Sequence, residues 1–265
     1  MLLSGSAIPT DLSSTHIELY ASTDGGVTWK FISHIASGGE AVPNNGLTPV
    51  WEPFLMLYQG QLVCFYSDQR ANATHGQKMV HQTTTDGVNW GPVVDDVAYP
   101  TYTDRPGMPT VSELPNGKWI MTYEFGGGPV NGSVPANYSF PVYYRLSDSP
   151  LTFNEADGIP IVALDGSGMI PFGSPYNVWT ETKNTKGDGL IIVSCGTQST
   201  VYINKKLGDA NSWEVRETGE RVSYTRSLRV LKEHGKERLL LAGGGMLPPS
   251  NNNSVTVGKI DIESW

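Results

Sequence analysis

Cysteine, charged residues and long apolar runs are all scarce in this chain. Its 265 residues include two cysteines, and charged residues make up only 17%. Cys64 and Cys195 both lie within apolar stretches, so we expect buried free thiols, with a disulfide as the lesser alternative. No apolar run is long enough to cross a bilayer as a helix. The formal net charge of -8 disfavours nucleic acid and anionic membranes as partners, and we expect neither.

Motifs for metals, phosphates and redox chemistry are also missing. His75 and His81 have no further ligands at a usable spacing, so no metal site is predicted. The sequence contains no glycine-rich phosphate loop, nucleophile elbow or Cys-x-x-Cys pair. No cofactor is therefore expected, and no helix of consequence is visible.

A signal peptide is the last absence. The chain begins MLLSGSAIPT, which lacks the charged segment and the full apolar segment of a secretory leader. Four N-x-S/T sequons, at Asn72, Asn131, Asn137 and Asn252, are nevertheless typical of a secreted eukaryotic protein. We expect a secreted protein whose leader is absent from this sequence.

Glycine, proline and aromatic residues are plentiful, which favours an all-β protein with many turns. Residues 22–29 read STDGGVTW and match an Asp-box, S-x-D-x-G-x-T-W, between two alternating strands. In such a turn the aspartate accepts backbone hydrogen bonds and the tryptophan packs between strands. Asp24 is thus predicted to be structural rather than catalytic.

Weaker copies of the Asp-box recur about every 60 residues, at 84–90, 147–153 and 204–213. Four strand-like runs per repeat are typical of a β-propeller. The repeat predicts inner hairpins at 49–70, 105–126, 174–198 and 224–245, and a closing strand at 255–262. We therefore predict a single β-propeller domain over residues 1–265, incomplete at the N-terminus, with about four and a half blades.

Two glutamates fall on one face of this propeller. The start of a hairpin's first strand and the end of its second lie at the same end of the sheet. Glu52 starts one such hairpin and Glu124 ends the next, so both should face a central pocket. Paired carboxylates, arginines and aromatic side chains are typical of glycoside cleavage. Further candidates for sugar binding at these positions are Trp51, Tyr66, Asp68, Arg70, Arg105, Tyr123, Tyr176, Tyr224 and Arg226.

Structural roles compete with these assignments. Glu52 could be a solvated loop acid, Asp68 and Arg70 could form a salt bridge, and Arg105 and Arg226 could brace loops. Without further information the residues alone leave both interpretations open.

Several motifs resemble a known family: WEPFL, LVCFYSDQR, HGQKMVHQT, DRPGMPT, LPNG, TYE, SPY, SCGTQ and YTRSLRVL. From about residue 17 to 245 the chain is similar to the exo-α-1,5-L-arabinanases of glycoside hydrolase family 93. The resemblance implies a six-bladed sialidase-like propeller that releases arabinobiose from the non-reducing end of arabinan with retention of configuration. It also implies that Glu52, in W-E-P, and Glu124, in T-Y-E, are the catalytic pair. We expect a monomer.

The resemblance leaves a difference at the front, since family members carry about another blade and a half before Asp24. The chain is therefore expected to be an N-terminally truncated form. One alternative is a sialidase, in which Arg70, Arg105 and Arg226 would bind a carboxylate and Tyr224 would be the nucleophile. Another is a glycan-binding propeller, or an inactive truncated one.

Overall fold

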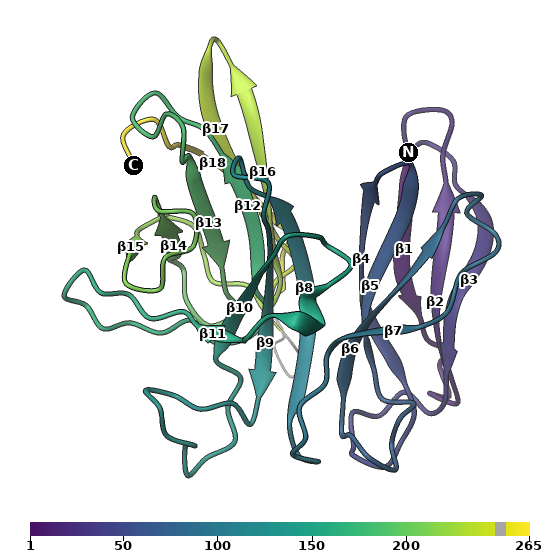
Figure 1. The fold of residues 1–265 in the computed structure, drawn as a ribbon. Helices are drawn as coiled ribbons and strands as arrows, with labels where there is room; N and C mark the ends of the chain where they lie inside the picture. Colours follow the sequence, from purple (N-terminus) through teal and green to yellow (C-terminus); the bar gives the residue numbers. More distant parts are fainter. Residues whose placement is uncertain (247–252) are drawn as a thin grey trace. The chain divides into compact units, whose positions relative to one another are not determined.

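Antiparallel strands that pair in chain order make up this protein, and a computed structural model describes residues 1–246 and 253–265 (Figure 1). The predicted sequon at Asn252 lies outside the described residues. Within them the only helix is one 3-10 turn, Phe153–Glu155, and none is long and apolar enough to cross a membrane. The chain divides into two compact units, Met1–Pro109 and Thr110–Trp265.

The first unit contains two complete sheets. One has three strands and the other has four, each in sequential antiparallel order. The strands are β1 (Leu2–Ala7), β2 (Thr15–Ala21) and β3 (Lys30–Gly38), then β4 (Val50–Tyr58), β5 (Gln61–Asp68), β6 (Lys78–Thr84) and β7 (Val94–Val97).

The second unit continues the same pattern, and β8 (Arg105–Glu113) runs across the boundary into it. Its sheets have four, four and three strands. They are β8 with β9 (Trp119–Gly126), β10 (Val142–Ser147) and β11 (Ile159–Pro160); β12 (Tyr176–Thr180), β13 (Leu190–Ser194), β14 (Val201–Asn204) and β15 (Trp213–Arg216); and β16 (Arg226–Glu233), β17 (Lys236–Gly243) and β18 (Thr256–Asp261).

All four predicted inner hairpins are present, as β4–β5, β8–β9, β12–β13 and β16–β17. The predicted closing strand is β18, which pairs with β17 as the third strand of the last sheet. The sequence analysis missed β1, because its sequence, LLSGSA, does not alternate between apolar and polar residues. The all-β prediction is thus confirmed, with sheets built as the blades of a propeller are.

Apolar side chains on facing sheets form the cores of both units. In the first unit, Ile17 and Leu19 of β2 pack with Val50, Cys64 and Val80 of the next sheet. In the second unit, one core joins the β8–β11 sheet to the β12–β15 sheet, and another joins the latter to the last sheet. Cys64 and Cys195 are both buried and free, as expected.

The Asp-box turns close the outer ends of the sheets as predicted. Asp24 accepts hydrogen bonds from the Thr28 amide (2.9 Å) and from the Ser22 hydroxyl (2.8 Å). Asp86 accepts from the amides of Val88 and Asn89, both at 2.8 Å. These hydrogen bonds stabilise the charged form of each carboxylate, because its oxygens accept all of them.

The aromatic anchors of the repeat differ in their burial. Phe153 and Trp213 are fully buried, and Trp90 packs on the core of the first unit. Trp29 is 37% exposed, and its indole donates to the carbonyl of Gly26 in its own turn. The prediction that Trp29 packs between strands is therefore wrong, since its ring covers its own turn instead.

Acid should weaken these turns. Hydrogen bonds from the amide and side chain of Asn89 hold the pKa of Asp86 well below its usual range. Because the folded-state pKa is lowered, the stabilisation is present above the unfolded pKa near 4 and is lost as the pH falls through the folded pKa. We expect Asp86→Asn to lower Tm at pH 7. In thermal scans, the difference in Tm between this variant and the wild type should become smaller as the pH falls from 5 to 2. A gap that stays constant over this range would contradict the role of the charge.

Candidate active site

Glu52 stands at an irregular point of β4. The pairing of β4 with β5 shifts register between Trp51 and Phe54, and Glu52 has a left-handed φ of 61°. A bulge of this kind re-aims a side chain that would otherwise alternate with its neighbours. The Glu52 Oε2 atom accepts a hydrogen bond from the Ser67 hydroxyl at 2.8 Å and from the Met108 amide at 3.1 Å.

Arg105 organises the polar groups around this glutamate. Its guanidinium donates to the side-chain oxygens of Asn45 (2.8 Å), Gln69 (2.9 Å) and Gln77 (2.9 Å). Burial raises the pKa of Glu52, and the bonds from Ser67 and Met108 and the charge of Arg105 partly oppose that rise. The Glu52 carboxyl group therefore keeps its proton to a higher pH than a solvated glutamate does.

Glu124 is placed by β9, an almost wholly buried strand. It pairs with Val142 of β10 and is only 9% exposed. Its Oε2 atom accepts a hydrogen bond of 2.8 Å from the backbone amide of Ser174. A carboxylate at the end of an apolar strand is stable there because it has a hydrogen-bond donor and an opening to a pocket.

A pocket of about 610 Å³ in the second unit includes Glu124. This volume is in the usual range for sites that hold small ligands. Apart from Glu124 the wall is mainly aromatic rings and small residues: Ser139, Phe140, Phe172, Gly173, Gly196, Thr197, Tyr224 and Met246. One carboxylate among apolar faces fits a sugar ring, which offers its C–H faces to the aromatic rings and its anomeric carbon to the carboxylate.

Backbone hydrogen bonds bring these distant segments together. The amide of Gly127 donates to Ser139, and the amide of Gly173 donates to Phe140. A side chain at Gly126 would collide with the ring of Phe140, at 2.6 Å from an added Cβ. The long glycine- and proline-rich loop at 126–141 thus contributes Ser139 and Phe140 to the wall.

No protein-family model matches this chain, and no curated protein matches it. Several solved structures, however, are similar to this chain. The α-L-arabinofuranosidase of Fusarium graminearum, in complex with arabinobiose, is 52% identical with a TM-score of 0.92, and the alignment covers 98% of this chain and 71% of that one. The arabinanase of Penicillium chrysogenum, also with arabinobiose, is 55% identical with a TM-score of 0.91, covering 99% and 72%.

The Fusarium enzyme is described as a member of family 93. This chain belongs to glycoside hydrolase family 93. It is therefore a glycoside hydrolase with a β-propeller fold. A family 43 enzyme from Xanthomonas citri, 11% identical with a TM-score of 0.56 over 97% of this chain and 83% of that one, shows a likeness of fold alone.

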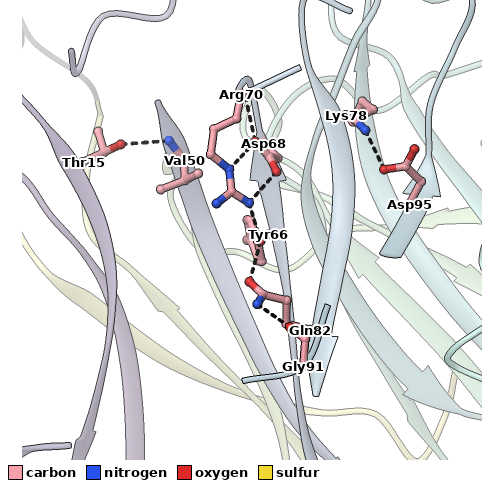
Figure 2. A network of polar contacts seen from close by, with 9 residues as sticks. All are labelled: Thr15, Val50, Tyr66, Asp68, Arg70, Lys78, Gln82, Gly91 and Asp95. Carbon is pink, nitrogen blue, oxygen red and sulfur yellow. Dashed lines mark hydrogen bonds and ion pairs between the residues drawn. The ribbon is translucent and has the colours of Figure 1, made fainter. Parts of the chain in front are cut away.

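Three residues that were predicted to bind sugar form a structural network in this family 93 chain (Figure 2). Arg70 makes a two-pronged salt bridge with Asp68, at 3.0 and 2.7 Å, and donates to the Tyr66 hydroxyl at 2.8 Å. Tyr66 is fully buried and donates to Gln82. The salt bridge matches the structural alternative that the sequence analysis left open for Asp68 and Arg70.

In the second unit, three more of the predicted residues have structural partners. Tyr123 is buried and its ring lies 6.1 Å from that of Tyr143. Tyr176 accepts a hydrogen bond from Arg229. Arg226 is 2% exposed and donates to the carbonyls of Ser199 and Thr200, as a residue that braces a loop does. Of the predicted residues in this unit, Glu124 and Tyr224 line the pocket.

Trp51 lies beside the Arg105 network, where its indole donates to Gln69 at 2.9 Å. Sequence reasoning missed Ser67, Gln69 and Gln77, although all three lie in the LVCFYSDQR and HGQKMVHQT motifs, on which the resemblance to family 93 was based. It also missed Phe140, Phe172 and Met246, for which the only signal was the long loop before Phe140. No group of three or more metal-binding side chains occurs in the described part of the chain.

Proposed function

We propose that this protein hydrolyses linear α-1,5-L-arabinan from the non-reducing end and releases arabinobiose. The observation that carries the proposal is the pocket at Glu124, a single buried carboxylate among aromatic walls. Family membership supports it, because two relatives above 50% identity have been solved with arabinobiose bound.

Glu52 and Glu124 are the proposed catalytic pair, in a mechanism that retains the configuration of the sugar. One carboxylate attacks the anomeric carbon and forms a glycosyl-enzyme, while the other protonates the leaving oxygen and later activates water. Burial raises the pKa of Glu52, which suits the acid/base role. Glu124, held by an amide donor, suits the nucleophile.

The test is incubation of this chain with linear α-1,5-arabinan, with products separated by chromatography and the first-formed anomer followed by proton NMR. Arabinobiose as the main early product, with the configuration of the substrate, supports the proposal. A ladder of random fragments, or no product from a chain shown to be folded by circular dichroism, contradicts it. A sialoside substrate is the control for the sialidase alternative.

The arginines give that alternative little support. A sialidase needs arginines that offer their donors to a carboxylate. Arg70 binds Asp68, and Arg226 donates to two backbone carbonyls. The neutral arabinofuranose needs no such cluster.

Secretion and a monomeric state complete the proposal. Asn131 and Asn137 are exposed on the loop before Phe140, where an oligosaccharide chain would be tolerated. Expression in a secreting host followed by mass spectrometry and size-exclusion chromatography tests both points.

A further inference from the structure

Three inner strands begin in the same unusual way. Glu52, Met108 and Ser174 have φ angles of 61°, 56° and 41°, and each is followed by a proline. A left-handed conformation is uncommon for residues other than glycine, and a following proline favours extended backbone instead. Most other non-glycine residues with positive φ precede a glycine in a turn, as Gln59 does. These three positions are therefore strained for a reason other than chain reversal.

The strain turns two of these amides onto the two proposed catalytic glutamates. The Met108 amide donates to Glu52 Oε2 at 3.1 Å and to Ser67 Oγ at 3.2 Å. The Ser174 amide donates to Glu124 Oε2 at 2.8 Å. The same device thus appears once in each unit, on a different strand and toward a different carboxylate.

Ser174 acts through its backbone rather than its side chain. It is 2% exposed, and its hydroxyl has no hydrogen-bond partner among the described residues. The segment at Gly196 packs closely against Ser174 and limits its movement. A Cβ added at Gly196 would lie only 3.3 Å from the Ser174 Cβ. With Gly173, at φ 70°, before it and Pro175 after it, Ser174 has little freedom to turn its amide away.

We propose that the Ser174 backbone amide is a positioning group, which orients the Glu124 carboxylate toward the pocket and favours its ionised form. A hydrogen bond to the charged form of a carboxylate favours that form, and a fixed oxygen limits rotation of the carboxyl group. This inference rests on the proposed catalytic role of Glu124 but concerns a group outside the pair. The Met108 amide has the corresponding position toward Glu52.

The direct test deletes one N–H group. Incorporation of the α-hydroxy analogue of serine at position 174 replaces the amide by an ester and leaves the side chain in place. The matched control is the same change at Gly189, whose amide donates to Thr185 at 2.7 Å in the turn between β12 and β13. Two readouts are taken: the pH profile of arabinan hydrolysis, and the titration of Glu124 by carbon-13 NMR of labelled glutamate.

We expect the ester at 174 to raise the pH of the acid limb and the NMR titration midpoint of Glu124 by about one unit. We also expect kcat to fall roughly tenfold with little change in KM. The ester at 189 should leave the limb and the midpoint in place. An unchanged midpoint in the 174 ester would overturn the proposal, whatever happens to activity. If the wild type has no activity on arabinan but the midpoint moves, the proposed function fails and the positioning role stands.

Two ordinary variants keep the test decisive if the ester protein does not fold. Ser174→Gly retains an amide in a conformation that glycine accepts freely, so the acid limb should stay at its wild-type pH. Ser174→Val disfavours the left-handed conformation and should turn the amide away, which moves the limb upward. Equal profiles for the two variants would contradict the proposal.

Discussion

Glu124→Gln is expected to abolish hydrolysis of both arabinan and aryl arabinofuranosides, with kcat/KM lower by roughly 10³-fold or more. Glutamine has the shape of glutamate but cannot form the glycosyl-enzyme, so a better leaving group does not help. The Ser174 amide that now donates to Glu124 can donate to the new amide oxygen, and the fold should survive. Steady-state kinetics with both substrates and a thermal scan measure the effect.

Glu52→Gln should behave differently if Glu52 is the acid/base. Cleavage of arabinan should again be lost, because its alkoxide leaving group needs a proton. An aryl substrate with an acidic phenol should still form the glycosyl-enzyme, and added azide should restore turnover as an arabinosyl azide product. In Glu124→Gln, an arabinosyl azide of retained configuration would reverse the two assignments, since azide that replaces a lost nucleophile gives the inverted product.

Exposed glutamates provide the controls. Glu40→Gln in the first unit and Glu113→Gln in the second make the same chemical change, at exposed positions outside the proposed site. Both should keep activity and Tm close to wild type. A loss in either control as large as that in Glu52→Gln or Glu124→Gln would show that net charge, not the pair, controls the rate.

The sequence was sufficient for the sheets because they follow from a repeat. Gly-bearing turns, Asp-boxes and aromatic anchors recur at a period that only a series of similar sheets explains. Every inner hairpin was predicted, and the two glutamates became candidates because both stand at hairpin ends. The missed strand, β1, lies outside the repeat and has no apolar alternation.

The alternation of side chains along a strand explains where the structure places Tyr123 and Tyr66. Successive side chains of a strand point to opposite faces, so Tyr123 and Glu124 cannot both face one pocket in a regular strand. Tyr123 packs on Tyr143, its cross-strand partner, and Glu124 lines the pocket. Tyr66 is likewise buried, while the adjacent Ser67 donates to Glu52. The same rule, applied to the sequence, would have found Ser67.

Other parts of the site had no signal in the sequence. The amides of Met108 and Ser174 depend on backbone angles that neither residue type favours, and the surrounding structure imposes those angles. Phe140 and Phe172 line the same pocket because Gly173 donates to the Phe140 carbonyl, a contact between segments more than thirty residues apart. The local sequence pattern does not indicate contacts between segments so far apart.

Arg105→Met should reduce both stability and activity, since one side chain supplies donors to several acceptors. Gln69 is fully buried and Gln77 is 6% exposed, and the guanidinium donates to the side-chain oxygen of each. Gln69 keeps the Trp51 indole as a donor, but the Gln77 oxygen loses the donor that Arg105 supplies. A buried acceptor that loses its donor costs about 1–3 kcal/mol, so Tm should fall by several degrees. The charge of Arg105 also lowers the pKa of Glu52. Removal of that charge should therefore move the limb of the pH–rate profile that reports the titration of Glu52 to higher pH.

The pH profile separates these two effects of Arg105. Arg105→Lys keeps the positive charge and loses most of the donors, so it should share the loss of Tm but show a smaller shift of the limb. Lys30→Met, which removes an exposed positive charge in the same unit, should change neither. A profile for Arg105→Met that matches wild type, together with a lower Tm, would mean that Arg105 only braces the loops of Asn45 and Gln77. A shifted profile would mean that this arginine also sets the proton affinity of Glu52, and so connects the stability of the first unit to its chemistry.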